Sequence, residues 1–195
     1  MKEVRFGTAL QKAFRDMAHR YGPHLTTAAT LTLKTYARIR VRRFENQENE
    51  IYEYGQALTD EIVRSTARRF EARLTHYLYG NQAKHPSKKQ WAKPLILVAI
   101  EGRNTHKRTH FHVAVGNIPA DRLARIDEII TQAWHDCDFG DKEVCVKPLT
   151  DSFGWLDYIT KEVGYTDNDA LAVEHTCIPE IIQQSICTEG RLLRG

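Results

Sequence analysis

The chain has 195 residues, of which 42% are hydrophobic and 27% charged, and its formal net charge is +3. This balance is typical of one soluble globular domain, and the small net charge does not by itself indicate a nucleic-acid-binding protein. No apolar run approaches the roughly 20 residues of a membrane-spanning helix, and the N-terminal segment is charged throughout. We therefore expect a single cytoplasmic domain over residues 1–195 that does not contact a membrane.

The first half of the chain predicts two helices with a strand between them. Residues 1–20 have the apolar spacing of an amphipathic helix. Residues 29–33 predict a strand, and the alternation of arginine with apolar residues over 38–42 allows that strand to continue. The polar, acidic residues 45–50 predict a loop or a hairpin tip. Apolar residues at helical spacing then predict a helix from 58 to about 79, with arginines on its outer side.

The second half begins with two strands. Residues 95–101 are strongly apolar, residues 109–116 alternate, and the polar segment between them is of hairpin type. Pro119 is placed to open a helix, and residues 142–148 alternate as a further strand. This part of the chain therefore adds three strands and a helix.

The remaining residues predict helix. Thr150 or Asp151 can cap a helix that runs to Gly164, whose position suits a C-terminal stop. One short helix is expected after Pro179. The element order predicts an α+β sandwich: an antiparallel central β-sheet with helices packed on one face and the other face left for a ligand. In this domain, residues 28–164 are the core and residues 165–195 a C-terminal extension.

Two sequence features are open to a plain and a functional interpretation. The four cysteines form no CxxC pair, so small buried residues are favoured over a zinc site, although His135 and Cys137 are both possible ligands. Arginines and lysines are clustered over 38–43, 64–73 and 84–89. Such clusters are either solvated faces or a phosphate-binding surface.

The pair His110 and His112 gives the strongest functional signal. On a strand both side chains point to one face, while Phe111, Val113 and Val115 point to the core. A hairpin register that pairs Glu101 with His110, and Ala99 with His112, would add a carboxylate. Two imidazoles and one carboxylate form a three-ligand metal site with positions open for substrate. His106, in the connecting loop, is a rival third ligand.

The pair Tyr158 and Lys161 is the second signal. Three residues apart on a helix, the two side chains project together, roughly opposite the apolar stripe that contains Ile159. Gly154, one helical turn before Tyr158, has no side chain that could obstruct the approach to the phenol. A surface Tyr/Lys pair without function is the plain alternative.

A strand with His-hydrophobic-His, followed by a helix with Tyr-x-x-Lys, resembles the HUH endonuclease superfamily over roughly residues 28–164. Residues 30–33 look like its first motif, His110 and His112 like its second, and Tyr158 with Lys161 like its third. The histidines precede the tyrosine and position 154 is glycine. These features are similar to the single-tyrosine branch, which includes rolling-circle replication initiators and transposases, rather than to relaxases.

The resemblance implies a ferredoxin/RRM-like fold and a function. A divalent ion, Mn²⁺ or Mg²⁺, held by Glu101, His110 and His112 would bind the scissile phosphate of single-stranded DNA. Tyr158, assisted by Lys161, would attack the phosphorus and form a 5′-phosphotyrosine that initiates replication of a phage or plasmid. The residues expected to contact the DNA backbone are Arg38, Arg40, Arg42, Lys107 and Arg108. No GxxxxGK[ST] segment is present, so we expect the helicase to be a separate protein, from the host or separately encoded.

Two alternatives stay open. A transposase would share the chemistry, and the DNA around the gene separates it from an initiator: a nick-site hairpin in a replicon, or paired hairpins at element ends. A non-catalytic nucleic-acid-binding domain would stack bases on aromatic side chains of the central strands.

Overall fold

The computed structural model describes residues 12–13, 16, 20–45, 48–85, 87–88, 91–103, 106–159 and 176–184. Over 42–45 and 48–50, and at 156 and 157, it describes the backbone alone. The predicted helix over 1–20 lies mostly outside these residues. Lys161 and most of the C-terminal extension lie outside them as well.

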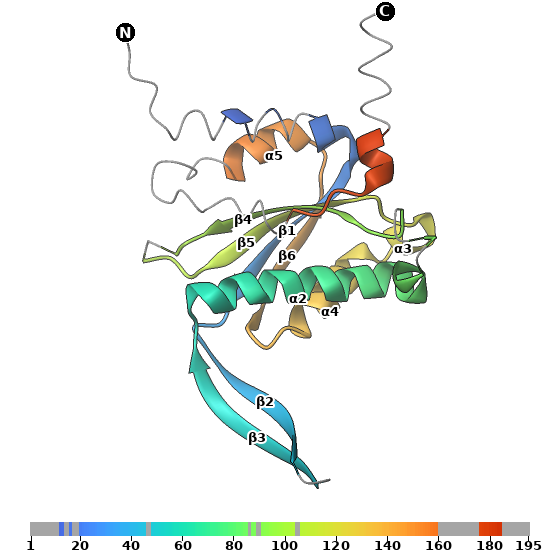
Figure 1. Cartoon of the computed structure of the whole chain (residues 1–195). Helices are drawn as coiled ribbons and strands as arrows, with labels where there is room; N and C mark the ends of the chain where they lie inside the picture. Colours follow the sequence, from blue (N-terminus) through green and yellow to red (C-terminus); the bar gives the residue numbers. More distant parts are fainter. Residues whose placement is uncertain are drawn as a thin grey trace, which may run out of the picture.

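The body of the molecule is a four-stranded antiparallel sheet (Figure 1). In spatial order its strands are β4 (Leu95–Glu101), β5 (His110–Gly116), β1 (Leu25–Leu33) and β6 (Gly140–Pro148). The antiparallel sheet and the coarse α+β class agree with the prediction.

Two helices cover one face of this sheet: α2 (Asp60–Tyr79) and α4 (Ile126–His135). Between them the core contains Phe70, Phe111 and Trp134, whose rings meet edge to face. Thr59 caps α2 by accepting a hydrogen bond from the backbone N–H of Ile62. The helix expected to open at Pro119 is two helices, the one-turn α3 (Ala120–Leu123) and then α4.

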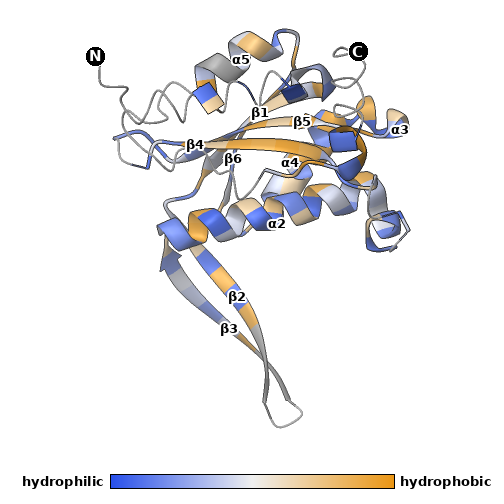
Figure 2. Ribbon diagram, turned by 45° about the horizontal axis from the view of Figure 1, so that its top comes forward, coloured by the Kyte–Doolittle hydropathy of each residue, from blue (hydrophilic) through white to orange (hydrophobic). Residues whose placement is uncertain are grey.

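The opposite face of the sheet is covered as well, so the expectation that all helices pack on one face is wrong. Helix α5 (Ser152–Ile159) lies over that face (Figure 1), and Ile159 packs there with Leu95, Leu97 and Ala114. All seven residues of β4 are buried. A strand that is apolar on both sides needs cover on both sides, and Figure 2 shows the hydrophobic residues along it. Helix α5 and the short segment η1 (Gly22–His24), which contacts it, lie on the side of this second cover.

A separate two-stranded sheet projects from the body as an arm (Figure 1). It consists of β2 (Tyr36–Glu45) and β3 (Glu48–Ala57). The continuation of the first strand through 38–42 is therefore wrong, because the chain leaves the main sheet after Leu33, and β3 was not predicted. The hairpin tip expected within 45–50 is confirmed, since the pairing runs out to Glu45 and Glu48.

The helix expected from 58 and the strands expected over 95–101, 109–116 and 142–148 correspond to α2, β4, β5 and β6, whereas the expected end of the last helix at Gly164 lies outside the described residues. After α2, the segment η2 (Gly80–Lys84) leads toward β4. Residues 180–184, just after Pro179, are helical. Among the described residues, no helix combines the length and the apolar character needed to cross a bilayer.

Candidate functional site

The hairpin of β4 and β5 brings the predicted ligand residues together. Glu101 pairs with His110 and Ala99 with His112, which confirms the register expected from the sequence. The turn begins at Gly102, whose φ of +90° is strained for a residue with a side chain. A Cβ at Gly102 would lie 2.6 Å from the carbonyl oxygen of Arg108. Glycine is therefore needed where the two strands close on each other.

Three donor atoms converge at the loop end of this hairpin. Glu101 Oε2 lies 3.0 Å from His110 Nε2 and 3.3 Å from His112 Nε2. The two Nε2 atoms are 3.2 Å apart. The side chain of Glu101 is 3% exposed and that of His112 7%, while that of His110 is 17% exposed. The group is thus held inside the protein, with His110 at its rim.

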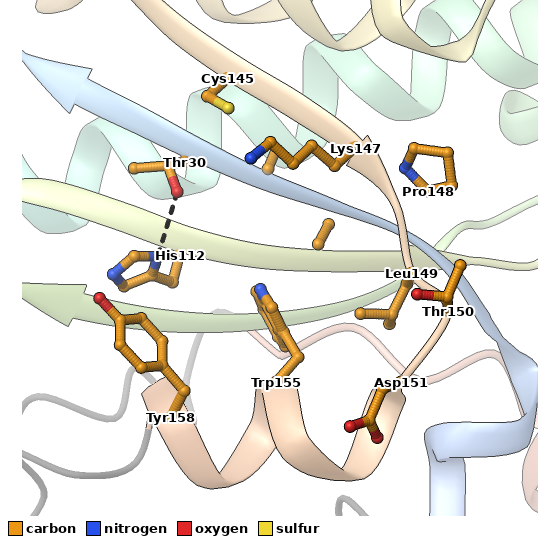
Figure 3. Close-up of a pocket in the computed structure, with 12 residues that line it drawn as sticks. Thr30, His112, Cys145, Lys147, Pro148, Leu149, Thr150, Asp151, Trp155 and Tyr158 are labelled. Carbon is orange, nitrogen blue, oxygen red and sulfur yellow. Dashed lines mark hydrogen bonds between the residues drawn. The ribbon is translucent and has the colours of Figure 1, made fainter.

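Hydrogen bonds to the other ring nitrogens orient the two imidazoles. His110 Nδ1 donates to the backbone oxygen of Arg108 at 2.9 Å, because a carbonyl can only accept. In a neutral ring this leaves the lone pair on Nε2, which faces Glu101. His112 Nδ1 lies 3.2 Å from the hydroxyl oxygen of Thr30 on the neighbouring strand β1 (Figure 3). Partners of this kind fix the orientation of metal-binding histidines.

The geometry of Glu101, His110 and His112 suits a metal ion. Donor atoms on adjacent corners of an octahedron lie about 3.0 Å apart when each bond is about 2.1 Å long. The three separations, 3.0, 3.2 and 3.3 Å, are close to that value. Three donors on one side of an ion leave other positions for water or substrate. The buried group can therefore bind a metal ion and present it to a ligand.

The other candidate metal ligands are not part of this group. His106 is exposed, and the described residues bring no second set of three ligands together. His135 is exposed, whereas Cys137 is buried, and burial raises the pKa of its thiol to about 12. Burial likewise raises the pKa of Cys177 to about 12. Such thiols stay protonated at neutral pH when no metal is bound, and neither belongs to the group of Glu101, His110 and His112.

Helix α5 places Tyr158 beside the histidines. The ring centroids of Tyr158 and His112 are 5.8 Å apart, and Figure 3 shows the phenol reaching from the helix toward that imidazole. Tyr158 is 53% exposed, whereas Ile159 is buried, as the helical pattern predicts. Asp151 caps the helix, since its Oδ1 accepts from the backbone N–H of Gly154 at 2.9 Å. A Cβ at Gly154 would collide with the same carboxylate, so glycine makes room for the cap.

Sequence reasoning missed the cleft that these residues border. It has a volume of about 330 Å³ and lies between α5 and the face of β1 and β6. Trp155 stands on its helix side, with its ring centroid 6.5 Å from that of His112. Thr30, Cys145 and Lys147 line its sheet side. The signal in the sequence was Trp155, three residues before Tyr158 and so on nearly the same side of the helix.

The basic residues predicted to contact DNA lie in two places. Arg38, Arg40 and the backbone of Arg42 belong to the arm, and Arg40 forms an ion pair with Glu53 at 2.6 Å. The arm projects from the side of the sheet away from α5 (Figure 1). DNA contact by these residues stays a prediction.

Lys107 and Arg108 lie in the β4–β5 loop, close to His110. Lys107 is exposed. Arg108 is bound to Asp141 at 2.7 Å and donates to the backbone oxygen of Leu33. The hydrogen bond from Arg108 holds the pKa of the Asp141 carboxyl below its ordinary value. Arg108 thus has a structural role, the bridging of this loop to β6, whatever its role toward DNA.

Comparison of the chain with protein-family models, with curated proteins and with solved structures finds no match.

Proposed function

We propose that the protein is a metal-dependent nicking and joining enzyme for single-stranded DNA, of the HUH type, with one catalytic tyrosine. The observation that carries the proposal is the position of His112. Its Nε2 belongs to the group with Glu101 and His110, and its ring also adjoins Tyr158. A nucleophile and a place for an ion thus border one cleft, as transfer of a phosphodiester to a tyrosine requires.

The residues would divide the chemistry as follows. A bound divalent ion would polarise the scissile phosphate and offset the charge that develops on it. The oxygen of Tyr158 would attack the phosphorus and form a 5′-phosphotyrosine. The bond from phosphorus to the 3′ oxygen breaks, the phenol loses its proton, and the leaving oxygen takes one up to become a 3′-hydroxyl. Because the phosphoester is conserved, a 3′-hydroxyl can reverse the step and join strands.

The donor set limits the choice of metal. Two imidazoles and one carboxylate favour an ion that accepts nitrogen and oxygen together. Mg²⁺ prefers all-oxygen surroundings, so Mn²⁺ fits the residues better, and Mg²⁺ is the second candidate.

Lys161 is proposed to stabilise the phenolate form of Tyr158.

The physiological role that we propose is the nicking of an origin at the start of rolling-circle replication. A transposase would use the same site on other DNA. The non-catalytic alternative is less well supported, because helix α5 and the imidazoles occupy the sheet face on which bases would stack. None of the exposed large aromatic residues among the described residues lies on the four central strands.

The test uses labelled single-stranded oligonucleotides that tile both strands of the DNA flanking the gene, incubated with the full chain and Mn²⁺. We expect a protein–DNA adduct on a denaturing gel for the wild type and none for Tyr158→Phe. Tyr54→Phe is the matched control, because Tyr54 is similarly exposed but lies on the arm. An adduct that survives in Tyr158→Phe, or the lack of any adduct with the wild type, would refute the assignment. Binding without cleavage would favour the non-catalytic alternative.

A further inference from the structure

The cleft beside Tyr158 has features that the nicking reaction alone does not require. Nucleophilic attack needs the tyrosine, the phosphate and the ion, and all three can meet at His112. The cleft extends from there along β1 and β6 to the segment Pro148–Asp151. At about 330 Å³ it is at the small end of ligand-binding clefts, which suits one small planar group and not a large ligand.

The sheet side of the cleft is shaped by small residues. Ala28 and Thr30 lie on the central strand β1, where their side chains leave the backbone of the strand close to the cleft. Cys145 and Lys147 on β6 pair with Thr30 and Ala28 in the register, so they lie on the same face. β6 is at the edge of the four-stranded sheet, and both residues are exposed. The cleft is therefore shallow on this side and opens at the sheet edge.

The helix side of the cleft is aromatic. In Figure 3 the indole of Trp155 stands up from α5 between His112 and Leu149, with its ring nitrogen directed at the strands. Trp155 is only partly buried, and its interplanar angle with His112 is 88°, so the two rings are not stacked on each other. An aromatic wall opposite small side chains is suited to a flat, weakly polar ring.

The charge at the cleft suits a nucleotide. Lys147 reaches along the sheet side (Figure 3), where its ammonium group can contact a phosphate at the open edge. Asp151 and Thr150 at the far end supply oxygen atoms that can accept hydrogen bonds from a base. An aromatic wall with a nearby cation is the combination by which proteins bind single-stranded nucleic acids.

We propose that this cleft binds one unstacked base of single-stranded DNA, from a nucleotide adjoining the scissile phosphate, with Trp155 as its stacking partner and Lys147 as a phosphate contact. The proposal rests on the proposed function for the identity of the ligand. It assigns Trp155 and Lys147 to substrate positioning. Seating one base in the cleft would fix which phosphate lies between Tyr158 and the metal ligands. Duplex DNA is excluded, because its bases are stacked and cannot enter.

The test measures DNA binding without cleavage. The full chain is titrated in EDTA with a fluorescein-labelled 12-nucleotide single-stranded pool, and binding is followed by anisotropy. We expect Trp155→Leu to weaken binding about 5- to 150-fold, the range found when one base loses its aromatic partner, and Trp155→Phe to restore most of the affinity. Trp91→Leu is the matched control: Trp91 is 40% exposed but is not among the residues that line the cleft. The thermal midpoint of each variant checks that it is folded.

The dependence on salt separates the two residues. Lys147→Ala should reduce the slope of log K against log salt by about 0.7, the contribution of one phosphate contact on a single strand. Trp155→Leu should leave the slope unchanged. Affinity of folded Trp155→Leu within twofold of the wild type would overturn the proposal. So would binding of a blunt duplex with the same dependence on Trp155.

This experiment and the adduct test can fail separately. If wild type forms the adduct while Trp155→Leu binds normally, the nicking function stands and the base-binding cleft is refuted. If Trp155 governs binding of single strands but no adduct forms, the cleft stands and the proposed catalysis is refuted.

Discussion

Glu101 carries a carboxylate into a position that is almost closed to water. Burying such a charge is costly unless a cation or hydrogen bonds compensate it. The Nε2 atoms of His110 and His112 are among its partners, and the ring of His110 already carries a proton on Nδ1. A proton donated from the Nε2 atom of either ring, or a metal ion, can compensate the carboxylate. The geometry permits both, and a metal titration distinguishes them.

We predict that Mn²⁺ stabilises the wild-type protein through these residues. An ion at a hundredfold excess over its Kd adds about 2.7 kcal/mol to the free energy of unfolding. For a chain of this length, that raises the thermal midpoint by about 5–10 °C. Glu101→Gln keeps the shape of the side chain and removes its charge, so the rise should be lost. The control variant His135→Ala changes an exposed histidine outside the group, and Mn²⁺ should still raise its thermal midpoint. An equal rise in Glu101→Gln would show that Mn²⁺ binds elsewhere.

At the scale of elements, the β4–β5 hairpin positions the site. Its turn has to bring Glu101 and His110 face to face, and Gly102 makes this possible with a positive φ. The carbonyl of Arg108 is doubly constrained there, since it lies against Gly102 and accepts the hydrogen bond from His110. A side chain at position 102 would therefore disturb both the turn and the orientation of one ligand.

Gly102→Ala should therefore lower stability by about 1–3 kcal/mol, the usual range for strained backbone, and also weaken Mn²⁺ binding. Gly80→Ala is the control, because Gly80 has a φ of +56° but nothing within 4 Å of its added Cβ. It should lose stability and keep its affinity for Mn²⁺. Denaturant unfolding and calorimetric titration measure the two effects. Unchanged Mn²⁺ affinity in Gly102→Ala would disprove the coupling.

A second element-scale contact joins α2 to α4. The Tyr77 hydroxyl donates to Asp136 at 2.5 Å, and this hydrogen bond holds the pKa of Asp136 below its ordinary value of 3.8. A carboxyl with a lowered pKa in the folded state stabilises the protein above pH 3.8, and this stabilisation is lost as the pH falls through the folded pKa. The same contact raises the pKa of Tyr77 above its ordinary value of 10, so the phenol keeps the proton of this hydrogen bond up to at least pH 10.

We predict that Tyr77→Phe lowers the thermal midpoint slightly at pH 7. The difference from the wild type should shrink as the pH is lowered below about 3.8, where the carboxyl takes up its proton first in the unfolded chain and then in the folded one. Tyr52→Phe, at an exposed position on the arm, is the control and should show no such pH dependence. Thermal scans at pH 7, 5 and 3 measure this. A constant difference between wild type and Tyr77→Phe would show that the hydrogen bond is not the cause.

At the scale of the whole molecule, the two faces of the sheet differ in what packs on them. One side holds the large core under α2 and α4, and the other holds a smaller cluster under α5, next to the candidate metal ligands and the cleft. The arm adds a third part, which projects away from α5 (Figure 1). Because the arm that carries Arg38, Arg40 and Arg42 projects away from α5, the helix of Tyr158, we predict that these arginines contribute to sequence-independent DNA affinity and not to catalysis.

The triple variant Arg38→Gln, Arg40→Gln, Arg42→Gln should weaken DNA binding by a similar factor for every sequence. It should also lower the salt dependence of binding. Its thermal midpoint should change little, because an exposed ion pair such as Arg40–Glu53 contributes little to stability. Arg122→Gln with Arg125→Gln, which changes exposed arginines in α3 and just before α4, is the control. If both variants bind like the wild type, the arm does not contact DNA.

The sequence by itself determined the local features of this protein. Alternation on β5 determined which face carries His110 and His112, and the polar loop was long enough to allow the pairing with Glu101, which the structure then confirmed. The helical pattern around Tyr158 exposed it and buried Ile159. These inferences succeeded because side-chain direction within a strand or helix follows from the backbone repeat alone.

Only the tertiary structure decided how the elements combine. It placed α5 on the second face of the sheet, because β4 is apolar on both sides and has to be covered on both. It also separated the arm from the main sheet, and it formed the cleft from residues that are more than a hundred positions apart, such as Thr30 and Trp155. Such proximities depend on which surfaces bury each other, and that is a property of the packed chain and not of any local pattern.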